Sequence, residues 1–169
     1  EDAIRGNPKA SVTIVTFSEF QCPFSVRLHG ILKRIEKHYG SSVRFVSKHL
    51  PLAFHEHARP AAKAAVCAQL LGDPWPYHDA LYEAGSTALA GTDYDQLAGK
   101  LGLDVKAFKR CRAQAEADAR IDADMTLAGV LGVRGTPTTF VNGFRLDGAQ
   151  GFAYFKAVID AALGPEADP

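Results

Sequence analysis

Residues 11–25 read Ser-Val-Thr-Ile-Val-Thr-Phe-Ser-Glu-Phe-Gln-Cys-Pro-Phe-Ser. The run 11–17 is β-branched and aromatic and has the length of a strand, so it predicts a buried strand at the centre of a sheet. From Phe24, apolar residues recur at helical spacing until Gly40, which can end a helix in a left-handed conformation. A strand therefore leads directly into a helix, with Cys22 at the junction.

The rest of the chain predicts a sheet domain interrupted by helices. Residues 42–52 return to strand character, which gives a βαβ unit with a right-handed crossover if the two strands are parallel. Residues 57–131 are rich in Ala, broken by Gly and Pro, and contain no convincing strand. Their expected helices are 57–71, 75–84, 93–101 and 105–131, the last one bent or split. Two short strands around an Asn142-Gly143 turn and a helix over 152–163 complete an α/β pattern.

Composition sets limits on partners. The 169 residues suit one domain or one domain with an insertion, and 47% hydrophobic residues can form a real core. With 19 basic and 19 acidic side chains the formal charge is zero, so we expect no nucleic-acid partner and no polybasic membrane surface. No apolar run approaches the roughly 18 residues of a membrane helix. The chain begins at Glu1 rather than Met, which we interpret as a processed or trimmed form.

Cys22 is the first candidate for chemistry. At the start of a helix, its sulfur lies beside unpaired N–H groups and the positive end of the helix dipole, which stabilise a thiolate. Pro23 suits the first helical turn, where its missing N–H costs nothing. These features favour a nucleophilic cysteine on an exposed turn. The alternative is a small buried hydrophobic residue, as free cysteines often are.

Several segments, in order along the chain, together carry a family resemblance. They are 12–15, 20–24 (Phe-Gln-Cys-Pro-Phe), 48–52 (Lys-His-Leu-Pro-Leu), 61–68, 75–82, 132–138 (Gly-Val-Arg-Gly-Thr-Pro-Thr), 142–143 and 148–150, with His55 and His57. The chain resembles the DsbA-like branch of the thioredoxin-fold thiol-disulfide oxidoreductases. The resemblance implies a thioredoxin fold over 1–56 and 132–169, interrupted by an all-helical insertion over 57–131.

The resemblance also implies partners and a location. It points to unfolded or disulfide-bearing protein substrates, with a membrane redox partner or glutathione as the thiol partner. It implies a periplasmic or otherwise extracytoplasmic location, although no signal segment is in view. It implies no cofactor.

The resemblance further places a cis peptide bond between Thr136 and Pro137, facing Cys22. Local sequence alone would favour trans, since only about 5–6% of X-Pro bonds in folded proteins are cis. A cis-Pro turn exposes the Thr136 backbone beside the thiol, where an extended peptide can add as a strand. The expected catalytic residues are Cys22 and Ser25, and the expected substrate-binding residues are Pro23, Phe24, Thr136 and Pro137.

Two positions depart from the family pattern. Ser25 stands where relatives usually have a second, resolving cysteine, and Thr16 stands where they usually have a buried glutamate. A trapping substitution would explain Ser25 alone, so the joint departure favours a naturally single-thiol site over an engineered one. Glu19 is the nearest acid that could compensate. Lys48 is retained without an acid at position 16, and we expect its ammonium group to reach water.

The other cysteines and the histidines are candidates for structural roles. Cys67 and Cys111 lie on different predicted helices and form either a structural disulfide or two reduced, buried thiols. The closest pair of potential metal ligands on one loop, His55 and His57, is too few for a zinc site, so we expect no metal.

Three functions remain open at this point. The leading one is thiol-disulfide exchange on protein disulfides through Cys22, with the mixed disulfide resolved by a second substrate thiol or a small thiol because Ser25 has no sulfur. The second is a glutathione-dependent enzyme like the kappa-class transferases, in which Ser25 would bind the glutathione thiolate and Cys22 would have no role. The third is a non-catalytic peptide-binding or chaperone module.

Overall fold

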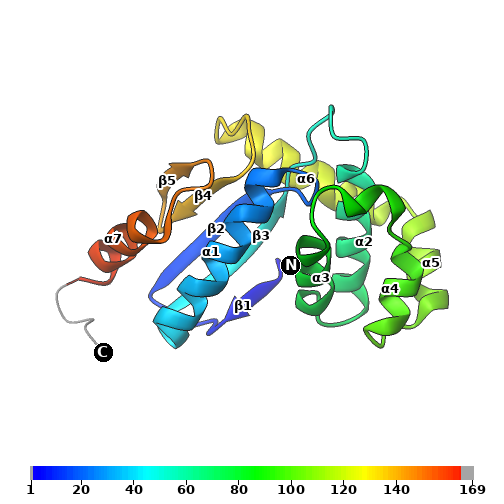
Figure 1. The fold of residues 1–169 in the computed structure, drawn as a ribbon, viewed down its shortest axis with the longest axis horizontal. Helices are drawn as coiled ribbons and strands as arrows, with labels where there is room; N and C mark the ends of the chain where they lie inside the picture. The colour runs from blue at the N-terminus through cyan, green and yellow to red at the C-terminus, as the bar shows by residue number, and fades with distance from the viewer. Residues whose placement is uncertain (1, 165–169) are drawn as a thin grey trace.

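A computed structural model describes residues 2–164, and five strands form one sheet in the order β1-β3-β2-β4-β5 (Figure 1). The strands are β1 Ile4–Gly6, β2 Val12–Ser18, β3 Val43–His49, β4 Thr138–Val141 and β5 Phe144–Asp147. β2 and β3 are parallel, and the other neighbours are antiparallel. The predicted central strand is confirmed, because β2 lies between β3 and β4. Residues 165–169, the end of the expected thioredoxin-like segment, lie outside the described residues.

The helices follow the predicted order. They are α1 Pro23–Tyr39, α2 Ala58–Leu71, α3 Trp75–Ala84, α4 Tyr94–Lys100, α5 Val105–Ala113, α6 Glu116–Val130 and α7 Phe152–Leu163, with short 3-10 turns η1 Gly40–Ser42 and η2 Ala88–Gly91. The long helix expected over 105–131 is split, because Gln114 takes an extended conformation (φ −92°, ψ 158°) between α5 and α6. No helix within residues 2–164 combines the length and the apolar character needed to cross a membrane.

β1 is a strand that the sequence pattern did not predict. It pairs antiparallel with β3 and is only three residues long, too short for alternation to be recognised. Gly6 allows this pairing: its φ is +90°, and a Cβ there would lie 2.8 Å from the Val43 carbonyl oxygen. β1 completes one edge of the sheet.

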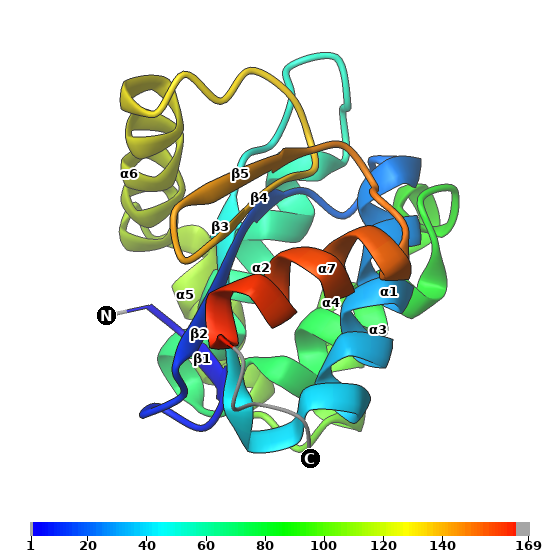
Figure 2. The ribbon, with the colours of Figure 1, turned by 90° about the vertical axis from the view of Figure 1, so that its left-hand side faces the viewer.

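Helices cover both faces of the sheet. Figure 2 shows α6 on one side and α1 with α7 on the other. Val12 and Ile14 of β2 pack in a core with residues of α1 and α7, whereas Phe17 packs in a separate core with Ala128 of α6. Alternation along β2 therefore directs Thr16 away from the face that carries Phe17.

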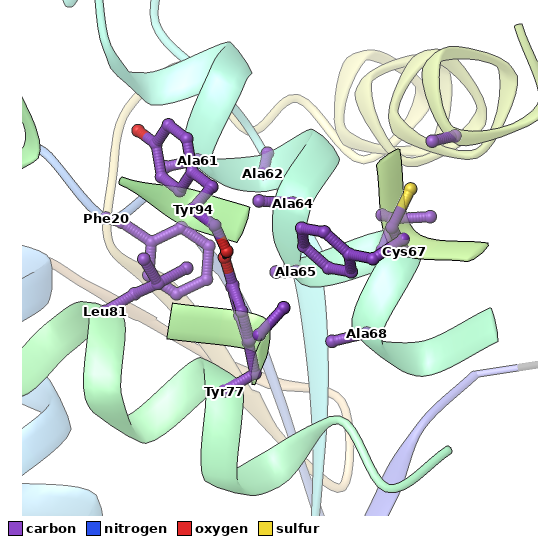
Figure 3. Packing of buried hydrophobic residues seen from close by; sticks show 14 of the residues in the cluster. Phe20, Ala61, Ala62, Ala64, Ala65, Cys67, Ala68, Tyr77, Leu81 and Tyr94 are labelled. Carbon is purple, nitrogen blue, oxygen red and sulfur yellow. The ribbon is translucent and has the colours of Figure 1, made fainter. Parts of the chain in front are cut away.

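The helices between β3 and β4 have a core of their own. Small alanine side chains on α2 lie among Phe20, Tyr77, Leu81 and Tyr94, as Figure 3 shows. Phe20 comes from the loop after β2, so this helical core reaches the segment that leads to Cys22. A disulfide joins Cys67 of α2 to Cys111 of α5, with a Cα–Cα distance of 5.8 Å.

Candidate active site

Cys22 caps the N-terminus of α1. Its backbone carbonyl accepts the first bond of the helix from Val26 N (3.0 Å), and Pro23 occupies the first turn, as expected. The free thiol belongs to a residue that is only 4% exposed, whereas Pro23 is exposed and Phe24 is 58% exposed. The turn is therefore exposed at Pro23 and Phe24, as expected, whereas Cys22 itself is buried, which is the burial that the alternative interpretation expected.

The residues that cover the sulfur come from the loop before β4. Cys22 Sγ lies 3.3 Å from the carbonyl oxygen of Thr136, to which it donates a hydrogen bond. The peptide bond between Thr136 and Pro137 is cis, and Pro137 is buried. The structure thus brings together Cys22, Thr136 and Pro137, which are more than 100 residues apart in the chain.

Ser25 lies one turn further along α1, beneath the surface. The residue is 2% exposed, and its hydroxyl has no hydrogen-bond partner among the described residues. It lines a cavity of about 40 Å³ together with Thr16, Ser18 and Tyr82. A cavity of this size has room for about one water molecule, which could satisfy the Ser25 hydroxyl.

Position 16 carries a threonine instead of an acid, and the Thr16 hydroxyl contacts a residue of β4. Thr16 Oγ1 lies 3.3 Å from Thr139 Oγ1 of β4, and both residues are buried. Thr16 and Ser25 line the same cavity, so a side chain at position 16 borders the same space as the residue that stands in place of a resolving cysteine.

A buried acid is present three residues before Cys22. The Glu19 side chain is fully buried and accepts a hydrogen bond from Gln21 N (2.6 Å). Its other oxygen is hydrogen-bonded to Nδ1 of His55, from the loop before α2. Gln21 Oε1 in turn accepts from the backbone N–H of His57 (2.7 Å). The loops on either side of the site are therefore tied together by polar contacts.

Tyr82 of α3 is a site neighbour that sequence reasoning did not place near Cys22. Its hydroxyl donates to Ser18 Oγ (2.8 Å), and the residue is buried. Burial raises the pKa of Tyr82, the hydrogen bond to Ser18 lowers it, and the nearby Glu19 and Cys22 raise it further. Through Ser18, Tyr82 connects α3 to the end of β2, the strand that leads to Cys22.

The expectation for Lys48 is wrong in one respect. Its ammonium group does not end in water but lies 2.9 Å from Asp124 of α6 and 2.5 Å from Asp2, and its side chain is only 12% exposed. Burial alone would lower the pKa of Lys48, but the hydrogen bonds to these carboxylates outweigh it and raise the pKa. Both acids are distant in sequence, which is why local patterns did not indicate them.

Comparison with known proteins agrees with this geometry. A family model described as Thioredoxin matches residues 1–161, and the chain belongs to this family. A thioredoxin-like oxidoreductase from Silicibacter pomeroyi DSS-3 is 28% identical, with a TM-score of 0.82 over 96% of this chain and 92% of that one. The thiol-disulfide exchange protein alpha-DsbA2 from Wolbachia pipientis, 18% identical, shares the fold with a TM-score of 0.81 over 95% and 86% of the two chains. The chain therefore has a DsbA-like thioredoxin fold, typical of thiol-disulfide oxidoreductases.

Curated relatives carry a different name. The Na(+)/H(+) antiporter NhaA 3 of Salinispora tropica is 36% identical over 171 residues, a match that covers 98% of this chain and 26% of the antiporter. The chain thus spans about a quarter of the length of the curated relatives it matches.

Proposed function

We propose that this chain catalyses thiol-disulfide exchange on protein disulfides through Cys22 as a single nucleophile. The observation that carries the proposal is the 3.3 Å approach of Cys22 Sγ to the Thr136 carbonyl at the cis-Pro turn. An extended substrate that pairs with the Thr136 backbone would bring its own disulfide to Cys22. The helix N-terminus then stabilises the attacking thiolate.

Each step of the reaction conserves the number of S–S bonds. The Cys22 thiolate attacks one sulfur of the substrate, so that a new S–S bond forms and the other substrate sulfur leaves as a thiolate. Ser25 has no sulfur with which to break the mixed disulfide. A second substrate thiol or glutathione therefore attacks it and regenerates the Cys22 thiolate. With a second substrate thiol the net result is isomerisation, which needs no oxidant.

Apolar side chains at the same end of the molecule suit an unfolded substrate. Phe24 is 58% exposed, Phe54 77% and Val130 79%. They lie at the start of α1, in the loop before α2 and at the end of α6, and these segments all lie in the upper part of Figures 1 and 2. Exposed apolar side chains near a reactive thiol can contact an unfolded substrate. We assign substrate contacts to Pro23, Phe24, Thr136 and Pro137, with Phe54 added.

An oxidising compartment fits the proposal. A disulfide such as Cys67–Cys111 persists in the periplasm or outside the cell and is rare in the cytosol. We therefore place the protein outside the cytoplasm, where a membrane redox partner or glutathione would exchange with Cys22. The transferase alternative is less well supported, because the Ser25 hydroxyl is buried beside a cavity too small for a tripeptide.

Refolding of a protein with scrambled disulfides tests the proposal. Wild-type protein with catalytic glutathione should speed the recovery of native disulfides, and Cys22→Ala should abolish this effect. Ser25→Ala, which keeps the thiol, is the matched control and should retain activity. Equal recovery of native disulfides with wild type and with Cys22→Ala would contradict the proposal and favour a non-catalytic binding module.

A further inference from the structure

A second cluster of chemical groups lies between α1 and α3. His29 of α1 and His78 and Asp79 of α3 each offer one ligand atom, and these atoms lie within 4.8 Å of one another. Asp79 Oδ1 is 3.2 Å from Nδ1 of His78 and 3.7 Å from Nε2 of His29. The cluster takes no part in the Cys22 chemistry described above.

His29 has a buried nitrogen without a partner. Its side chain is 9% exposed, yet Nε2 has no hydrogen-bond partner among the described residues, because 3.7 Å to Asp79 is too long for a hydrogen bond. Buried polar atoms are usually paired, so an unpartnered one calls for a ligand or a water molecule. His29 and His78 both line the cavity behind Ser25, which gives access to this nitrogen.

The other Asp79 oxygen is held in place. Oδ2 accepts from Arg5 (2.8 Å) and Lys33 (3.1 Å), which leaves Oδ1 directed at the histidines. Hydrogen bonds of this kind orient the ligands of metal sites. Glu36 lies 3.6 Å from Arg5 and Glu83 lies 3.2 Å from Lys33, so the group holds two cations and three carboxylates. Its net charge of −1 with neutral histidines does not repel a cation.

The three side chains are of the types that bind zinc. Imidazole nitrogens and carboxylate oxygens are, with thiolates, the usual ligands of zinc in proteins.

We propose that His29, His78 and Asp79 form a binding site for one Zn²⁺ ion, with water from the cavity as the fourth ligand. Ligand atoms on a tetrahedral zinc, with bonds of about 2.0–2.2 Å, lie roughly 3.3–3.6 Å apart, close to the two separations measured from Asp79 Oδ1. Because no two of the three ligand atoms lie more than 4.8 Å apart, the largest separation would have to shorten by at most about 1.5 Å. The ion would link α1 to α3.

Titration of ZnCl₂ against a chromophoric chelator tests the site, with the Cys67–Cys111 disulfide intact. Wild type should bind one Zn²⁺ per chain, and His29→Leu and His78→Ala should each weaken binding by at least about 100-fold, since even the partners of metal ligands are worth 10–100-fold. His38→Ala, a change at a histidine of the same helix outside the cluster, and Cys22→Ala should bind as wild type does. Loss of binding in Cys22→Ala, or unchanged binding in His29→Leu, would overturn the proposal.

A measurement on the unaltered protein tests the site even if the variants fail to fold. Co²⁺ in the site should give the intense visible bands of four-coordinate cobalt without the thiolate-to-metal charge-transfer band that Cys22 would produce. A thiolate band would show that the metal binds at Cys22, and the weak spectrum of hexa-aqua cobalt at saturating protein would show that it does not bind. Either result would overturn the proposal. Failure here leaves the proposed function of Cys22 untouched, because the two tests share no readout.

Discussion

Glu19 and His55, 36 residues apart, form a hydrogen-bonded pair in which the carboxylate is completely buried. The pair joins the loop that ends in Cys22 to the loop before α2. Glu19 is the acid that the sequence suggested as a substitute for the one missing at position 16. Its partners show a role that sequence could not supply, since Glu19 holds two loops together.

Removing His55 should destabilise the protein. In His55→Ala the Glu19 carboxylate stays buried with only its bond from Gln21 N, and loss of one partner of a buried pair costs about 3–5 kcal/mol. The His55 side chain is 21% exposed, so we expect the lower end of that range in urea denaturation. His57→Ala is the control, because the contact given by His57 uses its backbone N–H. Equal unfolding free energies for the two variants would contradict the structural role of the pair.

Stability should fall as the pH is lowered from 7 to 4. Burial lowers the pKa of His78 to about 4 from its ordinary value of 6.5, so below pH 6.5 the unfolded chain binds a proton that the folded chain does not. The stability from neutral His78 is therefore present above pH 6.5 and lost progressively down to about pH 4. This shift in the pKa of His78 corresponds to about 3 kcal/mol of unfolding free energy.

Denaturation in EDTA at a series of pH values measures this effect without bound metal. His78→Gln should flatten the dependence by about 3 kcal/mol between pH 7 and 4. His38→Gln, at a position outside the buried cluster, should leave the curve as it is. A steep curve that persists in His78→Gln would assign the pH dependence to other groups.

The Cys67–Cys111 disulfide should contribute a large part of the free energy of unfolding. Cys67 and Cys111 are separated by 44 residues, and the chain-entropy model predicts a contribution between about 3 and 4.7 kcal/mol. The double variant Cys67→Ala/Cys111→Ala should lose at least this much in urea denaturation. Reductant should lower the stability of wild type and leave the variant unchanged. If reductant has no effect on wild type, the bridge is not structural.

Phe54 should contribute to substrate affinity without supporting the fold. Because it is 77% exposed, Phe54→Ser should leave the unfolding free energy within about 0.5 kcal/mol of wild type. KM for an unfolded substrate should rise roughly fivefold, as expected for loss of about 1 kcal/mol of apolar contact. Tyr154→Ser, on α7 and 51% exposed, is the control. A KM that rises equally in both variants would show that the effect is not local.

Sequence predicted the fold well because its signals are local. The strand before Cys22, the helix after it and the two strands around the Asn142–Gly143 turn each follow from apolar pattern and turn residues. β1 was missed because three residues carry no pattern and its pairing depends on β3. The cis bond before Pro137 could be expected only from the family resemblance, because local sequence favours trans.

The site was predicted only in part, because local motifs do not show contacts between residues that are far apart in the chain. Cys22 and Pro137 are marked by short motifs, but the burial of Cys22 depends on a loop that returns more than 100 residues later. The acids that bind Lys48 and the groups around His29 come from separate elements. Their sequence separation leaves no spacing to recognise.

The central claim, that Cys22 works alone because Ser25 cannot resolve its mixed disulfide, is tested most directly by the lifetime of that species. Mass spectrometry should show a mixed disulfide between Cys22 and a substrate peptide that persists in wild type until a thiol is added. Ser25→Cys should release the peptide, because the thiol introduced at position 25 can form an internal disulfide with Cys22. Thr16→Glu in the same chain should speed release, since position 16 lines the cavity beside residue 25 and a carboxylate there can take the thiol proton. Equal lifetimes in wild type and Ser25→Cys, or no mixed disulfide at Cys22 at all, would contradict the account.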